Sequence, residues 1–158
     1  MGAINNVFNQ AAGAVAGAGL IIQHAKETDF SKMNAAENAA LTARNQYRDV
    51  KAEAKEATDE AMKDNGLYNQ LAVAGRNTKK AERAYDEAKN RKNGAIKTIL
   101  KKRNDLIAAQ EAEQELKNKY KALSDLRDRA NEQRVHAEKA AKIAEEAQQK
   151  YQSRWGGK

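Results

Sequence analysis

Seven basic side chains lie in a part of the sequence that contains no acidic residue, between Glu87 and Asp105. They are Lys89, Arg91, Lys92, Lys97, Lys101, Lys102 and Arg103. Phosphate is the ligand that such a cluster suits, because contacts between cations and phosphates release counterions from nucleic acid or hold anionic lipid headgroups. No aromatic residue lies among the cations, so stacking on single-stranded bases is not indicated. The alternative is a solvated face that keeps a helix in solution.

The residue types that catalysis or metal binding would need are scarce. His24 and His136 are the only histidines, and they lie on opposite sides of the main helical region. Glu132 lies one helical turn before His136, but there is no second such pair, so the spacing of a di-metal helical bundle is absent. Cysteine is absent as well, which excludes disulfides and thiolate metal ligands. We therefore expect no catalytic residue, no metal site and no cofactor.

The first 23 residues contain no charged side chain. The stretch from Ala3 to Ile22 is close to the length that a helix needs to cross about 30 Å of hydrocarbon. The residues expected to insert into a membrane or a partner protein are Ile4, Val7, Phe8, Val15, Leu20, Ile21 and Ile22. Four amide side chains make a single span marginal, although amides can hydrogen-bond between the helices of an oligomer. The alternative is a tail that packs against the rest of the protein or inside a larger assembly.

Abundant alanine and the absence of proline set the class of fold. The chain has 32 alanines in 158 residues, no proline, two phenylalanines and one tryptophan. No proline therefore interrupts the helical pattern between residues 31 and 154, where each would cost about 3 kcal/mol. Alanine buries little area, so the contacts between helices must be thin and repeated over a great length. An all-α protein is predicted.

A heptad seam begins at Met33 and alternates steps of three and four residues without a polar exception. Its members are Met33, Ala36, Ala40, Ala43, Tyr47, Val50, Ala54, Ala57 and Ala61. A second seam keeps one register from Leu67 to Tyr151, with Leu71, Tyr85, Ile99, Leu106, Leu116, Tyr120 and Leu123 as its other large apolar members. Apolar residues beside this seam, such as Ile96, Leu100 and Ile107, indicate that the last helix contacts more than one neighbour.

Seven polar side chains interrupt the second seam. They are Thr78, Lys92, Lys102, Glu113, Arg127, Arg134 and Gln148. In a two-stranded seam such residues fix the register and the partner, and in a tube of parallel helices they line a wet channel. Long polar side chains can also leave a narrow seam and reach solvent.

Two Asn-Gly sequences, near 64–66 and 92–94, are candidate breaks because both residues tolerate the left-handed conformation that ends helices. A turn at the second site gives a long antiparallel coiled-coil hairpin with the seven cations at one tip. Without that turn, an unbroken helix to Tyr151 gives an extended helical rod, and breaks at both sites give a three-helix bundle. The predicted segments are an apolar N-terminal helix in 1–25, a helical coiled-coil region in 31–152 and a flexible tail in 153–158.

The order of these segments resembles two groups of bacteriophage virion proteins, the small internal or ejection proteins of short-tailed phages and the DNA pilot proteins of microviruses. The shared features are a Met-Gly start, an uncharged Gly/Ala-rich lead with amides from Asn5 to Ile22, and then a proline-free helical region. The resemblance covers the whole chain and is one of composition and order. It implies a protein held inside the capsid or at the portal vertex and delivered with the genome. Its apolar end would enter the host envelope, and its helices would form part of a conduit.

Three functions are therefore hypotheses. The first is a non-enzymatic, oligomeric virion protein of a phage, acting in genome ejection or internal packing with other copies of itself and other virion proteins. The second is a coiled-coil adaptor or scaffold whose first residues bind a neighbouring protein and never meet lipid. The third is sequence-independent binding of nucleic acid through the cationic tip, which the net charge of +7 favours.

Overall fold

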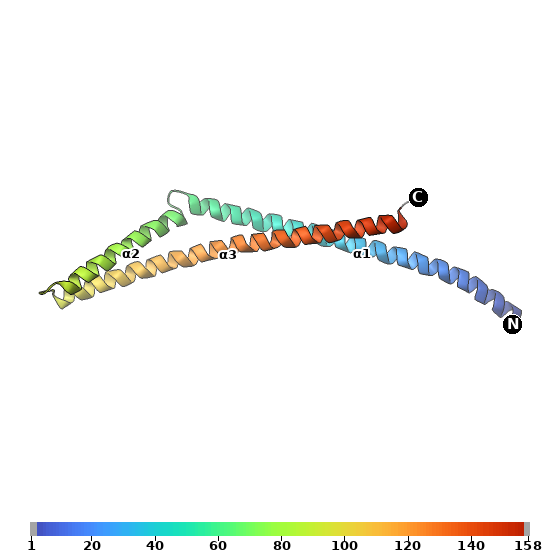
Figure 1. Cartoon of the computed structure of the whole chain (residues 1–158), viewed down its shortest axis with the longest axis horizontal. Helices are drawn as coiled ribbons and strands as arrows, with labels where there is room; N and C mark the ends of the chain where they lie inside the picture. The colour runs from blue at the N-terminus through green and yellow to red at the C-terminus, as the bar shows by residue number, and fades with distance from the viewer. Residues whose placement is uncertain (1–2, 157–158) are drawn as a thin grey trace. The chain divides into compact units, whose positions relative to one another are not determined.

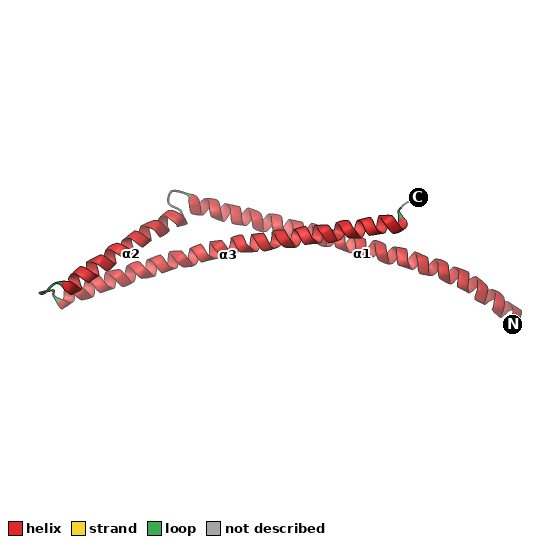
Figure 2. Cartoon of the chain, in the orientation of Figure 1, coloured by secondary structure: helices red, strands yellow, loops and turns green. Residues whose placement is uncertain are grey.

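Three α-helices make up the described part of the chain, and no strand occurs in it (Figures 1 and 2). The helices are α1 (Ala3–Met62), α2 (Leu67–Asn90) and α3 (Ile96–Trp155). The computed structural model describes the backbone of residues 3–156 and the side chains of residues 19–156. The predicted all-α class is confirmed. Four residues of the predicted insertion set, Ile4, Val7, Phe8 and Val15, lie outside the described side chains.

Helix α1 runs without interruption through the two segments that the sequence analysis separates at residues 25–31. Neither proline nor glycine occurs between Gly19 and Gly66, so nothing in the backbone breaks the helix at residues 25–31. The change from uncharged to charged residues therefore occurs within one continuous helix, and no break in α1 marks the expected segment boundary.

The connection between α1 and α2 is held by amide side chains in the first turn of α2. Asn69 Nδ2 donates to the Asp64 carbonyl oxygen at 2.6 Å, and Gln70 Nε2 donates to the Asn65 carbonyl oxygen at 2.7 Å. Gly66 lies against the end of α1, where a Cβ atom would meet the Ala61 carbonyl oxygen at 2.5 Å. Its φ of −79° is one that any residue adopts, so close approach is what requires glycine here.

The connection between α2 and α3 spans residues 91–95 and excludes an unbroken helix from Leu67 to Tyr151. Arg91 leaves the helical conformation with φ −73° and ψ 128°. The Gly94 amide N–H then donates to the Arg91 carbonyl oxygen at 3.3 Å, which closes a tight turn. Helix α2 and the first part of α3 are antiparallel as a result, and they run side by side in Figure 1.

The described structure divides into two compact units, one of Met1–Tyr47 with Gln133–Lys158 and one of Arg48–Glu132. In the second unit the buried residues are mostly small: Ala54, Ala61, Ala74, Ala88 and Leu123. Small side chains let helix backbones approach closely, but each buries little area. This unit therefore has a thin core that is repeated along its helices.

Two polar members of the predicted seam meet inside this unit. The Thr78 hydroxyl is buried and donates to the Ala109 carbonyl oxygen at 3.3 Å. The carboxylate of Glu113 lies within reach of the same hydroxyl and is 3.1 Å from Lys117 Nζ. The nearby Thr78 hydroxyl, followed by the interaction with Lys117, lowers the pKa of Glu113. Thr78 and Ala109 are equally far in sequence from the turn at Asn93–Gly94. Residues at equal distances from a turn face each other in two antiparallel helices, so this contact fits the register that the turn sets.

The second seam keeps its predicted register only in part after Leu123. Four of its positions stay buried or half-buried as predicted: Ala130, Ala137, Ala144 and Tyr151. At the alternate positions the residue one earlier is half-buried instead, and these residues are Leu126, Gln133, Ala140 and Ala147. The seam residues Arg127, Arg134 and Gln148 are exposed instead. The shift brings leucine and alanine into the packed face and leaves two guanidinium groups in solvent, where their charge costs nothing to solvate. Gln133 is the polar exception, because its Oε1 atom is buried without a hydrogen-bond partner among the described residues.

In the first unit, the C-terminal end of α3 packs against α1. The rings of Phe30 and Tyr151 meet edge to face with centroids 5.7 Å apart. Asp29 Oδ2 accepts hydrogen bonds from Arg154 Nη1 at 2.8 Å and from Trp155 Nε1 at 2.9 Å. The flexible tail predicted for 153–158 is therefore wrong for residues 153–155, which continue α3 because these contacts hold them.

Gly66 and Gly75 allow a matched test of the α1–α2 connection. Gly66→Ala should lower the free energy of unfolding by about 2 kcal/mol, because its Cβ would collide with backbone oxygens. Gly75→Ala should raise it by about 0.5–1 kcal/mol, because Gly75 lies inside α2 with nothing within 4 Å of the added Cβ. Urea unfolding followed by circular dichroism measures both changes. Equal effects of the two substitutions would contradict the close approach at Gly66.

Acid should release Trp155 from Asp29. The hydrogen bond from Trp155, together with the charge of Arg154, lowers the pKa of Asp29 below its ordinary value of 3.8. A carboxylate with a lowered pKa stabilises the fold fully above 3.8, and this contribution is lost as the pH falls through the lowered pKa. We expect the emission of Trp155, the only tryptophan, to shift to longer wavelength in that acid range.

Two variants accompany this titration. Asp29→Ala should show the shifted emission already at neutral pH and no further acid step. Asp125→Ala, which removes an exposed carboxylate from another part of α3, should titrate like the unmodified chain. Persistence of the acid step in Asp29→Ala would show that another group causes it.

Candidate functional site

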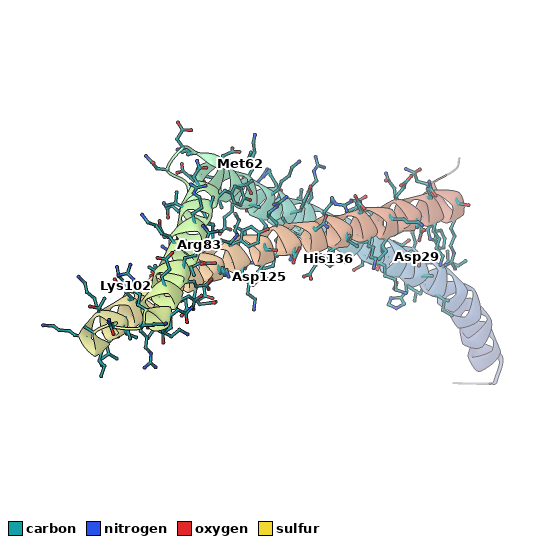
Figure 3. All side chains as sticks on the ribbon, turned by 60° about the vertical axis from the view of Figure 1, so that its left-hand side comes forward. Asp29, Met62, Arg83, Lys102, Asp125 and His136 are labelled. Carbon is teal, nitrogen blue, oxygen red and sulfur yellow. The ribbon has the colours of Figure 1, made fainter. Side chains whose placement is uncertain are left out.

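The turn between α2 and α3 places the end of one helix beside the start of the other, together with all seven predicted cations. Six of them are exposed: Lys89, Arg91, Lys92, Lys97, Lys101 and Arg103. Lys102, labelled in Figure 3 near this turn, is half-buried because it lies on the face of α3 that packs against α2. We call these seven residues the cationic tip.

Most cations of the tip form no ion pair with a described residue. Lys89 is the exception, since its Nζ lies 3.7 Å from Asp86 Oδ1 and 4.6 Å from the centre of the Tyr85 ring. The exposed side chains of Arg91, Lys92, Lys97, Lys101 and Arg103 form no ion pair with another described residue. The charges of Lys92, Lys97, Lys101 and Arg103 are therefore available to an external anion, whereas Arg91 lies close to acidic residues at the end of α2.

A hollow of about 480 Å³ lies beside the end of α2, but its lining does not suit phosphate. Arg83 and Arg91 line it together with the carboxylates of Asp86 and Glu87. The two acids offset the two cations, so an anion gains little there. Contact with a polyanion would instead use the convex surface of the tip.

Apolar side chains stand next to the cations on α3. Ile96 is 76% exposed, Leu100 follows one turn later and is 49% exposed, and Ile107 follows two turns after Leu100 on the same face. The sequence contains the signal for this surface, because the three residues lie beside the seam at helical spacing. Within the second unit no neighbouring helix covers them.

The described part of the predicted N-terminal insertion site is exposed. Leu20, Ile21 and Ile22 keep between 57% and 70% of their surface in solvent. Among the residues that the structure describes, no helix has a stretch long and apolar enough to cross a membrane. The described residues therefore leave these three apolar side chains largely uncovered.

The predicted seam residues separate into two groups. Tyr120 is 48% exposed, although its ring meets that of Tyr68 with centroids 6.1 Å apart. The other ten are buried or half-buried: Tyr47, Val50, Leu67, Leu71, Tyr85, Ile99, Leu106, Leu116, Leu123 and Tyr151. They hold helices together, and Tyr47 also lines a groove between α1 and α3.

The two histidines are exposed and far apart in sequence, and His136 is labelled in Figure 3 on α3. Within the described residues, no group of three or more histidine, aspartate or glutamate side chains is placed to hold a metal ion. Glu132 and His136 gain no third ligand from another helix.

Sequence reasoning missed an open apolar groove in the first unit. It lies between α1 and α3, and Leu41 and Tyr47 line it together with alanines of both helices. Leu41 was not identified because it stands outside the heptad seam. The sequence does contain a signal for the groove, because Leu41 is a large apolar residue directly beside the seam alanine Ala40.

Compared with known protein families, curated proteins and solved structures, the chain matches none of them.

Proposed function

We propose that this chain is a non-enzymatic structural protein of a bacteriophage virion, oligomeric, and active in genome ejection or in packing inside the capsid or at its portal vertex. The observation that carries the proposal is the set of large apolar side chains that the helices leave exposed, Leu20, Ile21, Leu41, Ile96 and Ile143 among them. Exposed apolar residues in such number are expected where other copies or other proteins complete the packing. The order of uncharged lead and alanine-rich helices, which resembles phage internal and pilot proteins, supports the same role.

The finer architecture in this proposal is a long antiparallel coiled-coil hairpin, with α1 and α2 as its first arm and α3 as its second. Contacts within each unit support it. Phe30 pairs with Tyr151 in one unit and Thr78 with Ala109 in the other, and both pairs have midpoints within a few residues of Asn93–Gly94. A helix of 60 residues is about 90 Å long, which gives such a protein reach across a portal or an envelope.

The N-terminal part of α1 is the element that we assign to the host envelope. The uncharged sequence supports this assignment, as do the exposed side chains of Leu20, Ile21 and Ile22. The alternative within the same architecture is a non-membrane adaptor, in which these residues fit into a neighbouring virion or cellular protein.

The envelope contact predicts a specific loss in vesicle binding. Replacing Leu20, Ile21 and Ile22 together by Asn should reduce flotation of the full chain with phospholipid vesicles at least about tenfold, because three exposed apolar side chains are lost. The control replaces Val73, Val135 and Ile143, which are also exposed, by Asn. Equal flotation of both variants and the unmodified chain would remove the membrane role and leave the adaptor.

The virion role has its own measurement. Mass spectrometry of purified particles of the phage that encodes the chain should detect it, and after adsorption it should move to the host envelope fraction. Its absence from the particles would overturn the virion proposal whatever the vesicles show.

A second candidate function is sequence-independent binding of nucleic acid through the cationic tip. The exposed cations Lys92, Lys97, Lys101 and Arg103, which form no ion pair with a described residue, favour it. In an ejection protein, such a tip would contact the packaged or passing genome. Counterion release makes this kind of contact strongly dependent on salt.

Salt titration of DNA binding tests the tip. Changing Lys97, Lys101, Lys102 and Arg103 to Gln should weaken binding to mixed-sequence duplex and flatten the slope of log K against log salt by about two to four. The control changes Lys119, Lys121, Lys139 and Lys142 to Gln, which removes the same charge from exposed positions outside the tip. A slope that falls equally in both variants would mean that net charge, and not the tip, binds the DNA.

A further inference from the structure

The groove of the first unit is an apolar surface that no residue of the described part of the chain fills. It has a volume of about 530 Å³ and lies between α1 and α3. Its apolar lining comes from Ala40, Leu41, Tyr47, Ala137 and Ala141. Leu41 projects at its edge and is 56% exposed, the largest exposed aliphatic side chain in the lining.

Two opposite charges stand on either side of Leu41 along α1. Glu37 precedes Leu41 by four residues and Arg44 follows it by three, and both line the groove. At about 1.5 Å per residue the two charged residues lie at nearly equal distances from Leu41, and helical spacing places all three on one face. Neither Glu37 nor Arg44 forms an ion pair with another described residue.

On the α3 side of the groove, the charged side chains already pair with each other. Arg134 Nη1 contacts Glu138 Oε1 at 3.0 Å, one turn away on α3. The unbalanced charges at the groove are therefore those of α1. A partner must offer a cation opposite Glu37 and an anion opposite Arg44, with an apolar side chain between them.

A second copy of the same helix, laid antiparallel, meets this requirement. With a two-fold axis near Leu41, the Glu37 carboxylate faces Arg44 of the other copy, and Arg44 faces Glu37 of the other copy. The two leucines then fill the apolar surface between these pairs. A parallel arrangement would place Glu37 against Glu37 and Arg44 against Arg44, which is repulsive.

We propose that the groove is the contact between two copies of this chain, related by a two-fold axis at Leu41 and held by reciprocal Glu37–Arg44 pairs. A two-fold contact uses the same patch on both copies, and a self-complementary patch is its requirement. The inference rests on the oligomeric role proposed above and names the surface that creates the oligomer. Larger assemblies would be built from this pair of chains.

Charge reversal provides the sharpest test because the two-fold axis doubles each change. Glu37→Lys alone, and Arg44→Glu alone, should each raise the dissociation constant of the full chain on the order of tenfold, since each turns two attractive pairs into two repulsive ones. Glu37→Lys combined with Arg44→Glu restores opposite charges across the axis and should return the constant to near its original value. Sedimentation equilibrium at low salt measures all four proteins.

Leu41 is tested against a matched residue in the same unit. Leu41→Asp should abolish association, because a carboxylate would then lie at the axis against its own copy. Ile143 is 59% exposed and does not line the groove, so Ile143→Asp should leave association unchanged. Circular dichroism confirms that each variant keeps its helix content. If Leu41→Asp loses helix content, the charge-reversal variants alone test the proposed contact.

Three outcomes would overturn the inference. They are a chain that remains monomeric at the highest concentration studied, an association that Leu41→Asp leaves intact, and a double reversal as weak as the single ones. These measurements use the isolated chain without lipid or phage. If the chain is found in phage particles but shows none of this association, the dimer contact is wrong and the virion function stands. If the chain associates as expected but is absent from particles, the contact stands and the virion function is wrong.

Discussion

Close approach of helices through alanine is the constraint on which the rest of this structure depends. Six of the seven buried apolar residues in the described part are alanine, and Leu123 is the seventh. Alanine allows the backbones to come near each other, but its methyl group contributes little of the burial energy that scales with area. The fold must therefore extend its contacts over long helices instead of concentrating them. The larger apolar side chains consequently stand beside the seam, many of them in solvent.

Polar groups supply the specificity that an alanine seam cannot. One methyl group is much like the next, so a seam of alanines can slide by a heptad at small cost. Thr78 with Ala109 and Glu113, and Asp29 with Arg154 and Trp155, are contacts that exist in one register only. Asn69 and Gln70 do the same for the connection before α2, where their amides bind loop carbonyl oxygens. The long helices are aligned at these few points.

The two candidate interaction surfaces follow from this arrangement. The turn at residues 91–95 brings cations from both sides of Asn93–Gly94 to one end of the second unit, where they remain largely unpaired. In the first unit, an open groove remains between α1 and α3, and Leu41 is exposed in its lining. We propose a polyanion as the partner of the first surface and a second copy of the chain as the partner of the second.

The sequence by itself determined the helical class, through the absence of proline and the heptad spacing from Met33 to Ala61, because these act within a single helix. It also indicated both interruptions, since glycine and asparagine change local backbone preferences. Only the tertiary structure decided which of two neighbouring residues is packed at every second seam position after Leu123, and that Trp155 belongs to α3. Neighbouring heptad positions are almost equivalent on an isolated helix, so the choice depends on the opposing helix. Likewise, the carboxylate of Asp29 lies 126 residues before Trp155, and no local pattern connects the two.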